Sequence, residues 1–142
     1  MDSKEKPLLK DFTINIKIKL ALFWTAVTFC YLYGDYFELY TPDKVSSLIS
    51  GENVLNTPII LLIASVVMVL PPLMIILSLV LKPNLNKWFN IVIGSLFTIM
   101  MLLIAVGSLT PWYSFYVFLA LVEATMTSVI VWNAIKWPRE NN

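Results

Sequence analysis

Four long apolar stretches run through the chain, and short polar segments separate them. The stretches cover about residues 18–37, 58–81, 88–109 and 112–135. Each is close to or above the roughly 20 apolar residues that an α-helix needs to cross the hydrocarbon core of a membrane. The pattern therefore predicts an all-α fold, a bundle of four transmembrane helices in a single membrane domain that takes up residues 1–142.

Two of the connecting segments are short. Residues 82–87 read KPNLNK, with a proline and two asparagines that are typical of a turn. The segment from Leu109 to Trp112 is shorter still, so the third and fourth helices must be antiparallel neighbours.

The segment of residues 38–57 is the only long loop between the spans. Within it Thr41 suits a helix N-cap, Pro42 suits the first helical position, and Gly51 suits the C-terminal stop. These signals predict a short helix over residues 42–50 that lies in the membrane interface.

The second apolar stretch carries Pro71 and Pro72 near its middle. Proline removes an amide donor and clashes with the preceding turn. We therefore expect a kink, with freed carbonyl groups near residues 67 and 68 that need other partners. The kink either fits the shape of the bundle or acts as a gating hinge.

Lysine and arginine are distributed unevenly between the two ends of the predicted bundle. If the N-terminus is cytoplasmic, Lys44 alone falls outside, and all the others fall inside: Lys4, Lys6, Lys10, Lys17, Lys19, Lys82, Lys87, Lys136 and Arg139. Cytoplasmic loops carry such an excess of positive charge. The pattern predicts that both termini are cytoplasmic and that residues 1–17 form a basic N-terminal segment.

The aromatic residues agree with this orientation. All six tyrosines fall toward the predicted outer ends, at Tyr31, Tyr33, Tyr36, Tyr40, Tyr113 and Tyr116. Trp88, Trp132 and Trp137 mark the inner side, and Trp24 is a further candidate for that inner belt, as expected for side chains that anchor at the membrane interface.

The composition supports a membrane protein and excludes several kinds of chemistry. Of 142 residues 58% are hydrophobic and only 13% are charged, against about a quarter in soluble domains. There is no histidine, and Cys30 is the only cysteine. We therefore expect no metal site, no cofactor, no thiol pair and no enzyme activity. The net charge of +1 indicates no nucleic-acid partner. The expected partners are the lipid bilayer and a second copy or another protein.

Three of the predicted helices carry small and polar residues at helical spacing, as helix contacts in membranes do. We expect these stripes to face the bundle interior. They are Ala21, Thr25, Thr28, Leu32 and Asp35 in the first helix; Asn90, Gly94, Thr98, Met101, Ala105 and Ser108 in the third; and Tyr116, Ala120, Glu123, Thr127, Ile130 and Ala134 in the fourth.

Glu123 is the one acid predicted to lie deep in the membrane. It is eleven residues from the outer end of its helix, which places it roughly 16 Å below that end. No Lys, Arg or His is expected at that depth, so the carboxyl group is either protonated or in contact with water. Thr28 and Thr98 match its depth, and we expect them to hydrogen-bond to it.

A second acid, Asp35, lies near the outer end of the first helix, roughly 13 Å above Glu123 by the same helical rise. With Glu38 it is expected to form a polar outer mouth above the deeper acid, and the tyrosines at this mouth are Tyr33, Tyr36 and Tyr116. The alternative is that Asp35 caps or salt-links a loop, through Lys44.

Three segments carry a family resemblance: YGDYFELYTP (33–42), NKWFNI (86–91) and WNAIKW (132–137). They resemble an uncharacterised family of small bacterial membrane proteins with four helices and a domain of unknown function, distantly similar to DoxX-like bundles. The resemblance covers about residues 17–138 and implies a four-helix bundle in a bacterial inner membrane. It implies no activity and transfers no functional residue.

Two functions follow from these observations. In the first, the protein is a non-enzymatic accessory or structural bundle in which Glu123 is a hydrogen-bonded clamp between helices. The alternative is a dimeric, proton-coupled transporter of an unidentified small molecule that works through Glu123. Small multidrug-resistance transporters also have four helices and one deep glutamate, but theirs is in the first helix, so direct membership is not expected.

Overall fold

The computed structural model describes residues 12–138. In that range it contains no strand, and four helical segments are long and apolar enough to cross a membrane, which confirms the expected fold class. The helices are α1 (Ile16–Glu38), α2 (Lys44–Ser50), α3 (Pro58–Met68), α4 (Leu70–Val80), α5 (Pro83–Gly107), the 3-10 turn η1 (Pro111–Tyr113) and α6 (Ser114–Ile135). Lys4, Lys6, Lys10 and Arg139, which entered the orientation argument, lie outside the described residues.

The third span begins earlier than residue 88, because the KPNLNK segment is already helical. Pro83 is at the first position of α5, where the missing amide of proline costs no hydrogen bond. Residues 83–87 therefore extend α5 by more than one turn, and only Leu81 and Lys82 connect it to α4.

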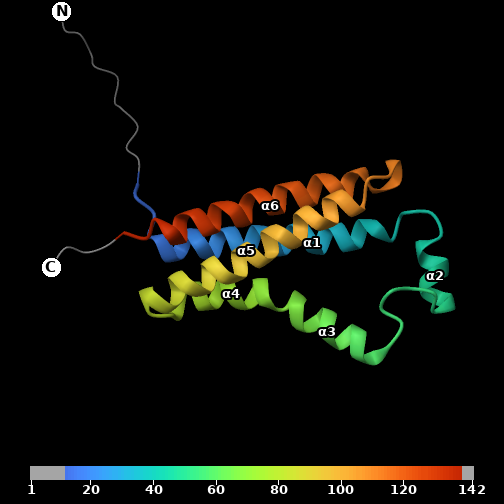
Figure 1. Cartoon of the computed structure of the whole chain (residues 1–142), viewed down its shortest axis with the longest axis horizontal. Helices are drawn as coiled ribbons and strands as arrows, with labels where there is room; N and C mark the ends of the chain where they lie inside the picture. The colour runs from blue at the N-terminus through green and yellow to red at the C-terminus, as the bar shows by residue number, and fades with distance from the viewer. Residues whose placement is uncertain (1–11, 139–142) are drawn as a thin grey trace, which may run out of the picture.

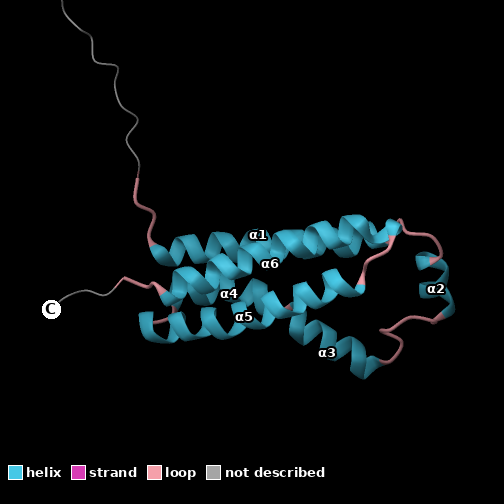
Figure 2. Ribbon diagram, turned by 45° about the horizontal axis from the view of Figure 1, so that its top comes forward, coloured by secondary structure: helices cyan, strands magenta, loops and turns pink. Residues whose placement is uncertain are grey.

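Four helices, α1, α4, α5 and α6, form the packed bundle, whereas α2 and α3 lie outside it. α5 packs mainly on α6, and α1 packs on both α4 and α6. α3 continues the line of α4 but bends away from α1, α5 and α6, as two views show (Figures 1 and 2). No residue of α3 is buried, so α3 owes little of its position to packing.

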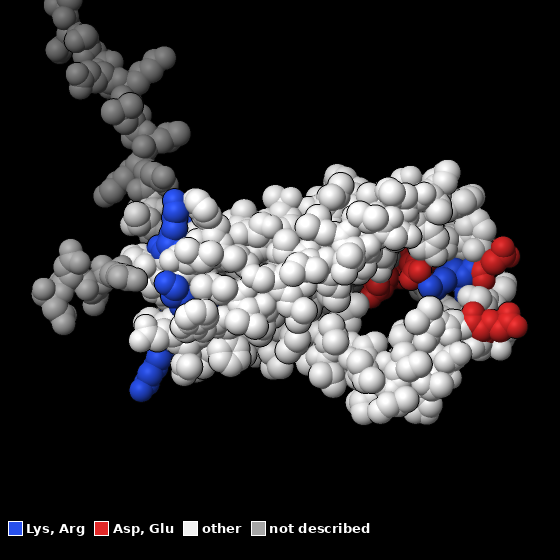
Figure 3. All heavy atoms as spheres, viewed as in Figure 1, with Lys and Arg blue, Asp and Glu red and all other residues white. Residues whose placement is uncertain are grey.

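The two ends of the bundle carry opposite charges (Figure 3). We call the end where α1 begins and α6 ends the lysine-rich end, and the end that carries α2 and η1 the acid-rich end. At the lysine-rich end the Lys17 ammonium group donates to the Leu81 carbonyl at 2.7 Å, and that of Lys87 donates to the Ile135 carbonyl at 3.3 Å. These bonds satisfy carbonyl groups at the C-terminal ends of α4 and α6.

A buried polar network joins three helices in the lysine-rich half. The Trp24 indole N–H of α1 donates to Asn90 Oδ1 of α5 at 2.7 Å. The Asn90 amide donates to Asn86 Oδ1 at 2.7 Å, and the Asn86 amide donates to the backbone carbonyl of Ser78 in α4. All four side chains are fully buried. The expectation that Trp24 joins an interfacial belt is therefore wrong.

Apolar packing surrounds this network. The Trp24 ring meets Phe97 edge to face, with centroids 6.0 Å apart. Leu20, Met74 and Ile130 are also fully buried beside them. Because lipid and core are equally apolar, shape and hydrogen bonding hold these helices together, rather than a hydrophobic drive.

The inward stripes of α5 and α6 largely match the expectation, whereas that of α1 matches only in part: Ala21 is buried as expected, but Leu32 and Asp35 are exposed. Leu32 is 56% exposed and points out of the bundle. The face of α1 that is turned inward instead runs through Trp24, Val27 and Gly34. At Gly34 a Cβ atom would be 3.5 Å from the Tyr116 ring, an ordinary van der Waals distance, so α1 and α6 pack against each other here without requiring a glycine.

The expected kink lies where the two prolines require it. α3 ends at Met68 and α4 starts at Leu70, with Val69 between them. Pro72 cannot donate to the carbonyl of Met68, four residues earlier. The Tyr31 hydroxyl of α1 donates to that carbonyl at 3.1 Å, so a side chain replaces the missing backbone donor.

α2 begins later than expected. Asp43 has a φ of 61°, in the left-handed region, and the helix starts at Lys44. The Thr41 hydroxyl donates to the Glu38 carbonyl at 2.8 Å, so Thr41 closes the end of α1 and is not the N-cap of α2. Gly51 ends α2 with a φ of 78°, as its position predicted.

We predict that Asn90→Leu destabilises the bundle by about 2 kcal/mol, because it leaves the Trp24 N–H and the Asn86 amide oxygen buried without partners. Unfolding in mixed micelles of increasing dodecyl sulfate content measures the change. Asn133→Leu is the matched control, since the Asn133 amide bonds only to the Val129 carbonyl of its own helix. Equal losses in the two variants would contradict the role of the network.

We also predict that Gly94→Ala separates α5 from α6. A Cβ atom at residue 94 would be 2.8 Å from Cγ2 of Val131, whereas nothing lies within 4 Å of one at Gly107. The same unfolding measurement should show a loss for Gly94→Ala and none for Gly107→Ala, where alanine favours the helix. A Gly94→Ala protein as stable as the wild type would show that this contact is not tight.

Candidate functional site

Glu123 is a buried carboxyl group without a hydrogen-bond partner. It lies on the face of α6 that is turned toward α1 and α5, and it is only 2% exposed. Among residues 12–138 its Oε2 atom is the one buried side-chain nitrogen or oxygen atom that has no hydrogen-bond partner. A buried polar atom without a partner costs about 1–3 kcal/mol, so this position requires an explanation other than stability.

The two threonines expected to bond Glu123 do not do so. The Thr28 hydroxyl donates to the Trp24 carbonyl at 2.8 Å. The Thr98 hydroxyl lies 2.8 Å from the Gly94 carbonyl and 2.7 Å from the Thr127 hydroxyl. Depth matching failed here because a threonine in a helix can bond to the carbonyl four residues earlier. The expectation of a hydrogen-bonded Glu123 clamp is therefore wrong.

Glu123 lines a small cavity, which we call the chamber. Its volume is about 30 Å³, and its lining includes Tyr31 and Asp35 of α1, Met68 of α3 and Tyr116 of α6. A polar cavity larger than about 10–15 Å³ holds a water molecule. The chamber therefore has room for water or a small ion beside Glu123, but not for an organic molecule.

Asp35 lies at the boundary of the chamber. The Tyr116 hydroxyl donates to Asp35 Oδ1 at 3.3 Å, which links α6 to α1. Both residues also line a second, larger cavity, so this pair separates the two spaces. The sequence placed Asp35 and Tyr116 at a polar mouth, and the structure brings them together between Glu123 and the acid-rich end.

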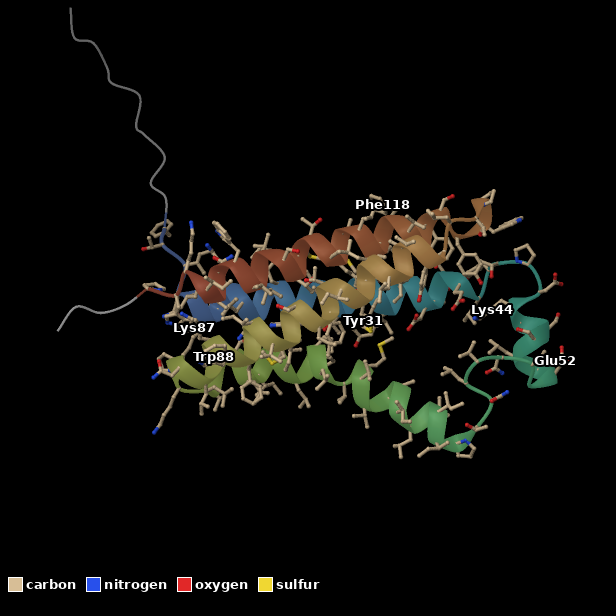
Figure 4. The ribbon with its side chains drawn as sticks, in the orientation of Figure 1. Tyr31, Lys44, Glu52, Lys87, Trp88 and Phe118 are labelled. Atoms are coloured by element: carbon tan, nitrogen blue, oxygen red, sulfur yellow. The ribbon has the colours of Figure 1, made fainter. Side chains whose placement is uncertain are left out.

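The second cavity, which we call the vestibule, has a volume of about 870 Å³. It lies between the inner face of α3, the loop with α2, and the acid-rich ends of α1 and α6. The space-filling view shows the opening with acidic side chains at its edge (Figure 3). The stick view shows Tyr31 near the point where α3 diverges, and Lys44 at the far end of the same gap (Figure 4).

Glu38 holds the far wall of the vestibule together. The Lys44 ammonium group is 2.7 Å from Glu38 Oε1, and the Tyr113 hydroxyl donates to the same oxygen at 3.2 Å. The expected salt link between Asp35 and Lys44 is therefore wrong, since Lys44 pairs with Glu38. Asp35 keeps only the Tyr116 hydroxyl as a partner among the described side chains.

Two of the tyrosines assigned to the mouth lie elsewhere. Tyr33 is 54% exposed and stacks on Phe37, and the Tyr36 hydroxyl lies 2.7 Å from that of Tyr40. Neither Tyr33 nor Tyr36 lines the chamber or the vestibule. Tyr31 lines the chamber instead. Its position four residues before Asp35 could have revealed this, because such residues share a helix face.

Within residues 12–138 no group of three or more His, Cys, Asp or Glu side chains comes together as a metal site. What the arrangement offers is one deep carboxyl group, a water-sized space beside it, and a tyrosine–aspartate pair above it. These groups can accept and release a proton or hold a small cation.

The family comparison adds membership but no activity. Residues 9–142 match a family of unknown function, DUF6326. The chain belongs to this family. No curated protein and no solved structure matches it. For this DUF6326 protein, four membrane-length helices and membership of an uncharacterised family are thus shown. The bacterial source and the likeness to DoxX bundles stay predictions.

We predict that Tyr31→Phe loosens α3, because it removes the donor to the Met68 carbonyl. Spin labels at Leu62 of α3 and Phe118 of α6, both lipid-facing, would report the distance between the helices in a Cys30→Ser background. The distance distribution should broaden. Tyr33→Phe is the control, since the Tyr33 hydroxyl is exposed. Equal widths in the two variants would show that Tyr31 does not restrain α3.

Proposed function

We propose that this DUF6326 protein is a non-enzymatic, proton-coupled membrane transporter in which Glu123 is the proton-binding group. The observation that carries the proposal is the Oε2 atom of Glu123, buried without a partner beside a water-sized chamber. A carboxyl group kept for stability would have hydrogen-bond partners, and an ionisable group inside a membrane marks a functional site by default.

A route for protons supports this proposal. The vestibule is open at the acid-rich end, and it shares Asp35, Met68 and Tyr116 with the chamber. A proton that moves between the vestibule and Glu123 would therefore pass these three residues, of which Asp35 and Tyr116 carry the polar groups. On the other side of the chamber, the packed Trp24 and Phe97 rings and the asparagine network close the bundle.

Transport needs a second state in which Glu123 communicates with the opposite side. The element best placed to move is α3, which is joined to the bundle through α4 and has no buried residue. Its junction at Val69 is restrained by the Tyr31 hydroxyl. We propose that the protein works as a dimer, in which a second copy supplies the surface against which α3 changes position.

We place the acid-rich end outside the cell. Lys17, Lys19, Lys82, Lys87 and Lys136 all lie at the opposite end, and the positive-inside rule assigns such an end to the cytoplasm. Together with the family resemblance, this supports our proposal that the protein lies in a bacterial inner membrane with both termini in the cytoplasm. The chamber then opens toward the side from which protons flow into an energised cell.

Infrared difference spectroscopy of the protein in lipid, from pH 5 to 9, tests the proposal. The groups that face Glu123 are Asp35, Tyr31 and Cys30 of α1 and Tyr116 of α6, while α5 brings only apolar side chains. We predict a protonated-carboxyl band that disappears as the pH rises, because a water-connected acid exchanges its proton.

Two variants assign that band and set the limits of the proposal. Glu123→Gln should abolish the titrating band, and Asp35→Asn should leave it present, since Asp35 is a separate carboxyl group. Proteoliposomes should also lose proton uptake in Glu123→Gln. A Glu123 band that persists over the whole pH range would contradict the transporter and favour the accessory or structural role.

A further inference from the structure

The acids of this protein are collected around the two cavities. Residues 12–138 contain five Asp or Glu side chains, and every one lines the chamber or the vestibule: Asp35, Glu38, Asp43, Glu52 and Glu123. Of the six lysines in the same range, only Lys44 lines either cavity. The positive-inside rule accounts for the lysines, but acids contribute little to topology, so this rule does not explain why the acids gather here.

We propose that the vestibule binds an amphiphilic organic cation, that is, an ammonium group with an apolar body. This inference rests on the proposed transporter function and names its substrate class. The charge balance of the walls selects a cation. Lys44 is paired with Glu38, which leaves three carboxylates without a cationic partner among the lining residues: Asp35, Asp43 and Glu52.

The two sides of the vestibule differ in a way that fits such a molecule. The bundle side carries Asp35, Tyr113 and Tyr116, whose carboxylate and aromatic groups both attract an ammonium ion. The opposite side is the face of α3 formed by Leu61, Ala64, Ser65 and Met68, which is apolar apart from one hydroxyl. An apolar body can therefore lie on α3 while the charged group reaches Asp35.

The volumes assign different occupants to the two cavities. The vestibule, at about 870 Å³, is in the range of pockets that bind small organic ligands, about 300–1,000 Å³. The chamber, at about 30 Å³, has room for water, a proton or a small ion but not for an organic molecule. Glu123, which is 98% buried and has no partner, lines the chamber just behind Asp35. Substrate and proton would therefore bind on the two sides of the Asp35–Tyr116 pair.

This proximity couples the two sites. A cation bound at Asp35 lowers the affinity of Glu123 for a proton. A proton on Glu123 lowers the affinity for the cation by the same factor, since coupling between sites is reciprocal. Competition of this kind is what proton-coupled exchange requires. The cation should therefore move the Glu123 titration to lower pH.

The test uses the full chain in dodecyl maltoside micelles, which carry no ammonium group, with empty micelles as the blank. The probes are benzyltrimethylammonium, its neutral carbon analogue neopentylbenzene, and tetramethylammonium, which lacks the apolar body. Saturation-transfer NMR and calorimetry measure binding. We expect benzyltrimethylammonium to bind most tightly, and each analogue to bind at least tenfold more weakly.

Variants locate the site. Asp35→Asn should lower the affinity for benzyltrimethylammonium at least tenfold. Asn84→Lys, which adds the same unit of positive charge at the exposed, lysine-rich end, should leave binding unchanged. Lys44→Gln frees the Glu38 carboxylate and should strengthen binding, a gain that a misfolded protein cannot produce.

The results separate this inference from the proposed function. If neopentylbenzene binds as tightly as the cation, or if Asp35→Asn and Lys44→Gln both leave affinity unchanged, the cation site is overturned. If Glu123 titrates but no cation binds, the substrate class is wrong and the proton site stands. If the cation binds at Asp35 while Glu123 never titrates, the vestibule is a cation site and the proton-coupled mechanism fails.

Discussion

The bundle depends on the buried hydrogen bonds around Asn90. In a membrane, apolar side chains gain little by leaving lipid for protein, so helices need shape and polar contacts to stay together. Asn90 supplies both for α1, α4 and α5, because it accepts from Trp24 and bonds Asn86, which reaches Ser78 in α4. The lysine-rich half is thereby closed and fixed. This anchored half fixes the positions of α1, α4, α5 and α6, and these helices carry the acid-rich half.

The acid-rich half is built on the opposite plan. Its polar groups line cavities instead of packing against one another, and α3, which forms one wall, has no buried residue. Glu123 lies at the border of the two halves. Its partners on the anchored side are taken, since Thr28 and Thr98 bond to backbone carbonyls of their own helices. Among the described residues, Glu123 lines the chamber, which lies toward Asp35.

The sequence could predict the parts of this arrangement that follow from one helix at a time. Span length, the break at Pro71–Pro72 and the inward position of Glu123 all follow from hydropathy, proline geometry and helical spacing. What it could not predict is which groups meet between helices. The sequence suggested that Trp24 is an interfacial anchor. A buried tryptophan can be told from an interfacial one only when its hydrogen-bond partner, here Asn90, is known. Lys44 likewise had two acids within reach, and only the course of the loop selects Glu38.

The separation of α3 from the bundle also bears on how the chain enters the membrane. The second span has the highest mean hydropathy of the four, 2.9 over its best window, whereas that of the first is 1.3. Such an apolar segment partitions into lipid by itself, so its insertion does not require contacts with other helices. The first span carries Asp35 and is completed by contacts with α4 and α6. α3, which has few contacts with the other membrane-spanning helices, is thus part of the span that needs such contacts least for insertion.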